Sequence, residues 1–325
     1  MHVLVDLQPA ISKVLTDCDS LFSRSAKKHS FEAASAWVLA DGRLHLQHGP
    51  IDLLIDAKGD EQEVRRAYSR AVDVFAPVLE TLTDELAGLR TPLAANSPDV
   101  VFSGQVAQRM MAAIEPYRGV LLTPMVAVAG AVADHVLQYV KQGAQLTRLA
   151  INNGGDISLA LEGEETYRIG VVADPSSSLH RDAHIVVDRK SGVGGIATSG
   201  WRGRSHSLGI ADAVTVLAGS AAAADVAATL IANAVDAPGA AGIRRQAAVE
   251  LAPDSDLRHN QVTVDVGDLD PIAVALAMRS GVHMAEQLYA SGLVLAVYIQ
   301  LKNEVAVVGD AHPLLESVDG TCEDS

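Results

Sequence analysis

Residues 152–156, which read Asn-Asn-Gly-Gly-Asp, constrain the fold more than any other segment of the chain. The glycines permit positive φ angles, and Asn and Asp tolerate them, so the backbone is expected to turn sharply here. The flanking segments 148–152 and 157–161 have the composition of short strands. Two interpretations stay open: a plain hairpin turn, for which Asn-Gly is a common signal, or a turn whose free N–H groups form a concave anion site.

The rest of the chain alternates between strand and helix patterns, which predicts an α/β (α+β) fold of mixed sheets with packed helices. A crossing rich in Gly and Ser, 191–207, is expected between two strands. Thr123 with Pro124, and Ser220, supply helix starts. The remaining expected strands are 35–40, 44–47, 51–56, 167–173, 184–188, 212–217, 293–300 and 304–308, and the expected helices are 61–88, 105–114, 124–140, 220–235 and 271–290.

The length of 325 residues and a hydrophobic content of 49% allow a large buried core. We expect a single unit over residues 1–325, with a loosely separated sheet and helix part at 30–95 and a core motif region at 120–235. The segment 91–98 holds two prolines and is the best internal linker candidate.

Charge and cysteine content exclude several classes of function. A formal net charge of −15 opposes a generic grip on nucleic acid, so no nucleic-acid partner is expected. The two cysteines have no neighbouring ligand spacing, so neither a disulfide framework nor a zinc site is indicated. No export signal or membrane-spanning run is visible, and we expect a cytoplasmic protein.

Asp225 and Thr229 lie four residues apart in an expected helix, and this spacing places a carboxylate and a hydroxyl on one face. Such oxygens suit Mg²⁺, which often bridges substrate phosphates. The alternative is structural: Thr229 bonds to a carbonyl of its own helix, while Asp225 complements the helix dipole.

A second polar segment, 194–200, ends with Thr198, Ser199 and Gly200. It offers two hydroxyls and accessible backbone, and its glycine content is that of a loop rather than of a core element. The alternative to a binding loop is a flexible surface loop.

Taken in chain order, these segments resemble the ApbE-like superfamily. Residues 152–157 resemble its N-x-G-G-D-I motif, 197–200 its A-T-S-G and 224–229 its A-D-A-x-x-T, while 127–134 resemble its G-I-A-K-G-Y-A-V-D segment. The sequence around the A-T-S-G motif is most similar to the uncharacterised UPF branch. The resemblance covers residues 120–235.

The resemblance implies an ApbE-like fold that binds FAD or FMN with Mg²⁺ and acts on the FAD pyrophosphate, either as an FMN transferase or as a pyrophosphatase. It implies Asp225 and Thr229 as metal ligands, and a small-molecule nucleotide and a flavoprotein acceptor as partners. The implied nucleotide-binding residues are Asn153, Gly154, Gly155, Asp156, Thr198, Ser199 and Gly200.

The chain departs from the family pattern at two places. Ala129 replaces the lysine of the G-I-A-K-G segment, and the stretch H-I-I-D-P-R-T-G after A-T-S-G is missing. His206 is the only imidazole in the loop that remains and is the candidate catalytic residue; the alternative is a solvated loop residue without a catalytic role. Three functions stay open: a flavin-nucleotide enzyme, a non-catalytic flavin-binding or assembly protein, and a pocket for another phosphorylated or aromatic acid metabolite. A homo-oligomer, in which a second subunit shares part of the apolar surface, also stays open.

Overall fold

The computed structural model describes residues 33–95, 100–120, 122–171, 183–203, 205–253, 255–309 and 315–316. Its centre is a sheet of nine strands in the order β1-β2-β3-β4-β5-β8-β9-β12-β13, and every neighbouring pair is antiparallel. The strands are β1 (Ser35–Val38), β2 (Leu44–His48), β3 (Ile51–Gly59), β4 (Leu146–Asn153), β5 (Asp156–Leu161), β8 (Gly195–Ser199), β9 (Ala213–Ala218), β12 (Ala296–Leu301) and β13 (Glu304–Gly309).

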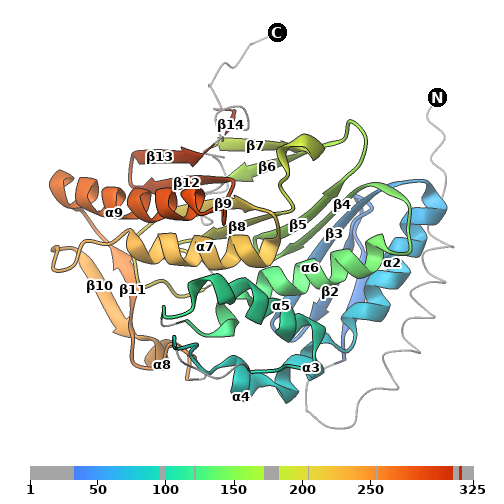
Figure 1. Cartoon of the computed structure of the whole chain (residues 1–325), viewed down its shortest axis with the longest axis horizontal. Coiled ribbons are helices and arrows are strands. Elements are labelled where there is room, and N and C mark those ends of the chain that lie inside the picture. Colours follow the sequence, from blue (N-terminus) through green and yellow to red (C-terminus); the bar gives the residue numbers. More distant parts are fainter. Residues whose placement is uncertain are drawn as a thin grey trace.

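The principal helices gather along one face of this sheet (Figure 1). They are α2 (Glu61–Phe75), α3 (Val78–Asp84), α4 (Leu86–Leu89), α5 (Gln105–Ile114), α6 (Val128–Lys141), α7 (Ala221–Ala234) and α9 (Pro271–Ala290). On the opposite face lies a small sheet in the order β14-β7-β6, formed by β6 (Thr166–Val171), β7 (Ala183–Asp188) and β14 (Leu315–Glu316). This mixed architecture confirms the expected fold class.

Successive side chains along the central strands point to opposite faces of the sheet and contribute to two separate hydrophobic cores. On β4, Leu149 and Ile151 belong to the helix-side core, whereas Ala150 belongs to the core beneath the small sheet. Likewise Ala197 of β8 faces the helices and Ile196 faces β7. A strand with both faces covered must be apolar on both sides, which explains why these segments lack a clean polar alternation.

The expectation of a loop at 194–200 was wrong, because Gly195–Ser199 is the buried strand β8 in the middle of the sheet. Glycine is needed in this strand because a larger residue would clash with the neighbouring helix, not because the segment is a loop. A Cβ atom on Gly195 would lie 2.0 Å from the backbone nitrogen of Ala221, where α7 begins. Only glycine allows the sheet and the start of this helix to approach so closely.

Two expected helices are interrupted. The segment 61–88 forms α2, α3 and α4, and Pro77 stands where α3 begins, because proline cannot donate the hydrogen bond that would continue α2. The segment 124–140 begins as the 3-10 turn η2 (Pro124–Ala127) before α6 takes over. The helices expected at 105–114 and 271–290 are confirmed by α5 and α9.

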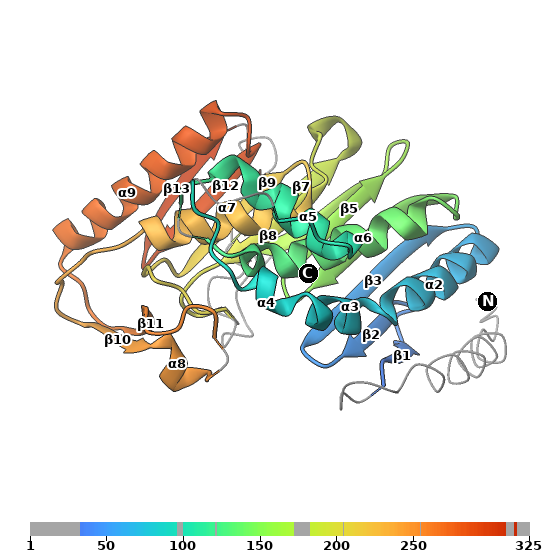
Figure 2. The same cartoon turned by 60° about the horizontal axis from the view of Figure 1, so that its bottom comes forward.

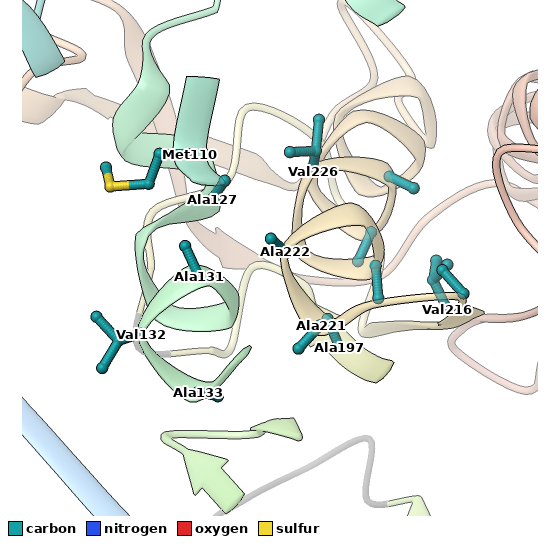
Figure 3. Packing of buried hydrophobic residues seen from close by; sticks show 14 of the residues in the cluster. Met110, Ala127, Ala131, Val132, Ala133, Ala197, Val216, Ala221, Ala222 and Val226 are labelled. Atoms are coloured by element: carbon teal, nitrogen blue, oxygen red, sulfur yellow. The ribbon is translucent and has the colours of Figure 1, made fainter. Parts of the chain in front are cut away.

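Small side chains allow α6 and α7 to pack closely. Ala131 and Ala133 of α6 are fully buried, as are Ala221 and Val226 of α7, and Figure 3 shows these short side chains where the helices meet. At the closest approach, a Cβ on Gly130 would lie 2.3 Å from the carbonyl oxygen of Ala221. The first turns of the two helices are therefore brought together.

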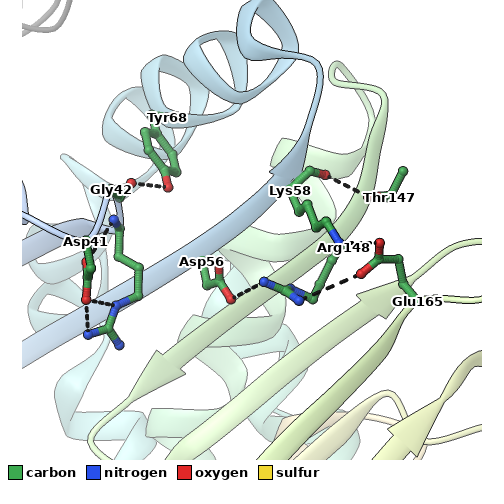
Figure 4. Close-up of polar contacts among 9 residues, drawn as sticks. Asp41, Gly42, Asp56, Lys58, Tyr68, Thr147, Arg148 and Glu165 are labelled. Carbon is green, nitrogen blue, oxygen red and sulfur yellow. Dashed lines mark hydrogen bonds and ion pairs between the residues drawn. The ribbon is translucent and has the colours of Figure 1, made fainter. Parts of the chain in front are cut away.

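An ion-pair network ties β3 and β4 to the turn before β6 (Figure 4). The Arg148 guanidinium lies 3.1 Å from the Asp56 carboxylate and 3.7 Å from the Glu165 carboxylate. The Lys58 ammonium also pairs with Glu165, at 2.6 Å. The side chains of Arg148, Asp56 and Glu165 are each about three-quarters buried, and the network links two neighbouring strands to this turn.

No helix or strand was expected between residues 243 and 266, where the structure has an arm beside the main sheet (Figure 2). It consists of β10 (Ile243–Ala247), the short helix α8 (Ala248–Leu251) and β11 (Gln261–Val266). Asp256 of this arm accepts the Thr123 hydroxyl at 2.5 Å, and the Thr263 N–H donates to the Ser207 carbonyl. The arm is thus fastened to the segment just before η2 and to the loop after β8.

None of the helices in the described ranges combines the length and apolar character needed to cross a bilayer. The two cysteines, the start of the part at 30–95 and the end of the linker at 91–98 lie outside the described residues. Of the linker, Leu93 is buried, and its N–H donates to the Leu122 carbonyl.

Candidate functional site

The Asn-Asn-Gly-Gly-Asp segment is a two-residue hairpin turn between β4 and β5. Asn153 pairs with Asp156, while Gly154 and Gly155 have φ angles of +67° and +119°. The Gly155 N–H already donates to the Asn152 side chain at 2.8 Å, so it is not free to form an anion nest. The hairpin interpretation of this turn is therefore confirmed.

The buried Asn153 side chain links this turn to the first turn of α6. Its amide donates to the Ala129 carbonyl at 3.0 Å. The hairpin is thus held against the helix start, and Asp156 begins β5 at this junction. Burial raises the pKa of Asp156 well above its usual value, the charge of Asp225 raises it further, and the backbone N–H of Thr198 partly offsets both effects.

Asp225 approaches the same junction from α7. One of its carboxylate oxygens accepts the Gly130 N–H at 3.1 Å, in the first turn of α6. Burial raises the pKa of Asp225 to about 7; the backbone N–H groups of Gly130 and Ala129 act in the opposite direction, and the charge of Asp134 adds to the increase. The structure therefore brings Asp156 and Asp225, distant in sequence, into electrostatic contact.

Hydrogen bonds from the start of α7 and from Ser158 stabilise the carboxylate of Asp134. Its carboxylate accepts the N–H groups of Ala221 and Ala222 at 3.0 and 2.9 Å and the Ser158 hydroxyl at 2.6 Å. These donors belong to a helix N-terminus, where a negative charge is favourable. Asp134 thus acts as a structural cap from a neighbouring helix, whereas Asp225 keeps capacity for a further partner.

Thr229 lies one turn after Asp225 on α7. Within the part of the chain that the structure describes, its hydroxyl makes no hydrogen bond, unlike that of Thr81, which donates to the Pro77 carbonyl of the preceding turn. The structural alternative for Thr229, a bond to its own helix, is thus not what the structure contains. Its half-buried hydroxyl is available for a ligand.

Thr198, Ser199 and Gly200 end β8 near this junction. The exposed Thr198 has its hydroxyl 2.9 Å from that of Thr215 on β9. Gly200 is buried, and a Cβ there would lie 2.4 Å from the carbonyl oxygen of Asp212. The segment is a rigid strand end, and Thr198 is its accessible polar side chain.

His206 is exposed in the loop that follows β8. The adjacent Ser207 bonds the Asn233 side chain, which lies about two turns beyond Asp225 on α7. His206 is therefore attached nearer the C-terminal half of α7 than the carboxylate pair. Arg202 in the same loop is held by Asp212 at 3.2 Å, and Arg204 lies outside the described residues.

Sequence reasoning missed the role of Asp212. This buried carboxylate accepts the Trp201 indole N–H at 3.0 Å, the Arg202 guanidinium and the Lys302 backbone N–H at 2.5 Å. It fixes the loop after β8 to the β12–β13 turn. The available signal was an isolated acid between the apolar residues Ala211 and Ala213.

The donor set of this junction suits a hard cation rather than a soft one. No group of three or more His, Cys, Asp or Glu side chains in the described ranges is arranged to hold a metal ion. The available donors are two carboxylates with raised pKa values and the hydroxyls of Thr198 and Thr229. Oxygen donors of this kind fit Mg²⁺, which retains waters in its coordination shell.

A family model described as AbpE bacteria matches residues 35–307 of the chain. A UPF0280 protein of Methanothermobacter thermautotrophicus is 36% identical over 148 residues, which make up 45% of this chain and 55% of that protein. A UPF0280 protein of Methanoculleus marisnigri is 31% identical over 210 residues, which make up 64% of this chain and 74% of that protein. The chain spans about half the length of several curated relatives that it matches.

Among solved structures, the chain is similar to the apo form of the flavinyl transferase ApbE from Pseudomonas stutzeri. The sequence identity is 13% and the TM-score is 0.35, and the similarity covers 88% of this chain and 97% of that one.

Proposed function

The chain belongs to the family described as AbpE bacteria, and from this membership we propose that it binds a flavin nucleotide together with Mg²⁺. The membership and the UPF0280 relatives confirm the resemblance to the uncharacterised branch of the ApbE-like superfamily. The proposed ligand is FAD, and the proposed site is the junction of β5, β8, α6 and α7.

The observation that carries the proposal is the meeting of Asp156 and Asp225. Burial opposes the ionised form of both carboxyls, and a neighbouring acid adds to this effect, Asp225 at Asp156 and Asp134 at Asp225. A divalent cation bound here with a nucleotide would offset both effects. Asp225 and Thr229 would hold Mg²⁺, which neutralises charge on a pyrophosphate when it is bound.

The proposed reaction is cleavage of the FAD pyrophosphate. A hydroxyl of a Thr or Ser on a flavoprotein acceptor attacks the FMN phosphorus, forms a phosphoester and releases AMP; with water as the nucleophile, the products are FMN and AMP. His206 is the proposed proton acceptor. The strand end at Thr198, Ser199 and Gly200 and the turn at Gly154 and Gly155 would line the nucleotide.

Flavin-stripped protein should be titrated with FAD and with FMN, with and without Mg²⁺. Bound flavin is followed by fluorescence, and AMP and FMN by chromatography. Mg²⁺-dependent formation of AMP and FMN supports the enzyme. Binding without products rejects catalysis and favours a non-catalytic flavin carrier, to which the replacement of the family lysine by Ala129 also points. Absence of flavin binding rejects the proposal.

Thr229→Val tests the metal site with little structural cost, because this hydroxyl has no hydrogen bond in the described residues. We expect a Mg²⁺ affinity at least about tenfold weaker and an unchanged melting temperature without Mg²⁺. Thr83→Val, which removes a hydroxyl bonded to the Glu80 carbonyl, is the matched control and should leave Mg²⁺ affinity unchanged. Equal Mg²⁺ affinities in both variants would remove Thr229 from the site.

His206→Gln tests the proton acceptor. Loss of general-base catalysis lowers turnover by about 10²-fold or more, while FAD binding should stay the same because this exposed imidazole is not among the residues proposed to hold the nucleotide or the metal. Turnover equal to that of the wild-type protein would reject His206 as a catalytic residue.

A further inference from the structure

A cavity separate from the Asp156 and Asp225 junction lies between α5, α6 and the start of α7. Its volume is about 410 Å³, within the range of small-molecule sites in proteins. None of the residues assigned above to the nucleotide or the metal lines it. Its walls are mainly apolar, with Ala112, Ala113, Leu137, Leu159 and Leu293 among the lining residues.

Arg109 is the one cation among the residues that line this cavity. Its guanidinium bonds the Gln138 side chain, and in the described part of the chain it has no carboxylate partner. Its Nε atom is buried and has no hydrogen-bond partner there. In a chain with a net charge of −15, a half-buried arginine without an acid is an open anion-binding group.

None of the other polar groups described in the cavity provides a negatively charged partner for Arg109. The Asp134 carboxylate lines it, but both of its oxygens accept hydrogen bonds from Ser158 or the start of α7. Ser220 accepts the Ala223 N–H through its hydroxyl oxygen and keeps its own proton to donate. Burial raises the pKa of Tyr117 to about 12, so this lining hydroxyl stays neutral.

The positive charge of Arg109 affects the protonation of the neighbouring His135. The pKa of His135 falls to about 4, first because of burial and then because of the nearby Arg109. His135 is therefore neutral and adds no second positive charge. The cavity thus offers one cation beside apolar walls.

From this geometry we propose that the cavity binds a small organic carboxylate with an apolar body. The planar guanidinium of Arg109 pairs with the carboxylate, and the aliphatic walls receive the apolar part. This ligand is separate from the flavin nucleotide, and the inference goes beyond the proposed function.

The test uses the full chain and three probes, phenylacetate, indole-3-acetate and octanoate, with their primary amides as uncharged controls. Binding is measured by ligand-observed nuclear magnetic resonance and by calorimetry. We expect at least one carboxylate to bind and its amide to bind at least about tenfold more weakly. Absence of binding by all three carboxylates, or equal binding of acid and amide, overturns the proposal.

Two variants locate the site. Arg109→Gln removes the charge and should weaken binding of the carboxylate at least about tenfold, whereas Arg66→Gln, at an exposed ion pair with Glu63, should leave it unchanged. Ala112→Leu fills the cavity from an exposed position of α5 and should also weaken binding. Unchanged affinity in both Arg109→Gln and Ala112→Leu overturns the site.

Asp225→Asn separates this cavity from the flavin site. We expect carboxylate binding to persist in this variant, with or without Mg²⁺ and FAD. Loss of carboxylate binding in Asp225→Asn would contradict a separate site. Failure of flavin binding together with retained carboxylate binding would reject only the proposed function.

Discussion

Asp225 of α7 accepts the backbone N–H of Gly130 in the first turn of α6, at 3.1 Å. Asp134 of α6 in turn accepts the N–H groups of Ala221 and Ala222 in the first turn of α7. Each helix thus supplies an acid to the N-terminus of the other, where the helix dipole favours a negative charge. The carboxylate assigned to the metal therefore also joins the two helices.

The raised pKa of Asp225 predicts a specific dependence of stability on pH. Its pKa is about 7 in the folded chain and about 4 in an unfolded one. Between these values the folded state keeps a proton that the unfolded state has released. The free energy of unfolding of the metal-free protein should therefore fall as pH rises from about 4 to about 7.

Urea unfolding across this pH range, on the wild-type protein and on Asp225→Asn, measures the effect. The amide does not titrate, so the variant should lose less stability with rising pH than the wild-type protein. Asp265→Asn, at an exposed carboxylate, should follow the wild-type curve. Parallel curves for wild type and Asp225→Asn would contradict the raised pKa.

Mg²⁺ should stabilise the protein more at about pH 8 than at about pH 5.5. At the lower pH the ion must displace a proton from Asp225, whose pKa is about 7, whereas at the higher pH this carboxyl is mostly ionised and can bind the ion without losing a proton. The measurement is the rise in melting temperature on adding saturating Mg²⁺ at each pH. An equal or larger rise at the lower pH would show that Asp225 does not hold the ion.

Most helices and strands of this fold could be predicted from the sequence because the residues that start or end them lie next to them in the chain. Asp270 and Pro271 mark the start of α9, and Ser220 caps α7 through the Ala223 N–H. The turn at Gly154 and Gly155 follows from residues that tolerate positive φ. Each of these signals depends on neighbours within four residues, so the sequence alone carries it.

The role of glycine in β8 could not be predicted in this way. From the sequence, Gly195 was interpreted as a loop residue. Glycine is required there because the backbone of Ala221, distant in sequence, lies too close for a Cβ atom. The caps supplied by Asp134 and Asp225 are also long-range. The A-D-A-x-x-T resemblance identified Asp225, but only the folded chain shows that it faces the start of α6.

Asp212→Ala should destabilise the protein by about 2–3 kcal/mol, because the donors from Trp201, Arg202 and Lys302 all lose the same buried acceptor. Urea unfolding measures the loss. Asp265→Ala removes an exposed carboxylate paired with Arg244 and should cost at most about 1 kcal/mol. Similar losses in the two variants would contradict the anchoring role of Asp212.

Gly130→Ala should force α6 and α7 apart. The added Cβ would lie 2.3 Å from the carbonyl oxygen of Ala221, a backbone atom that cannot rotate away. We expect a loss of about 1–3 kcal/mol in the free energy of unfolding, although alanine is the better helix former by about 1 kcal/mol.

Gly219→Ala is the matched control for Gly130→Ala, because an added Cβ at Gly219 meets no atom within 4 Å. Its stability in urea should stay close to that of the wild-type protein. Separation of the helices in Gly130→Ala should also lengthen the bond from Gly130 to Asp225 and weaken Mg²⁺ binding, whereas Gly219→Ala should bind the ion normally. Wild-type stability in Gly130→Ala would mean that the helices can move apart at no cost, and the mutual capping of α6 and α7 would then not fix the position of Asp225.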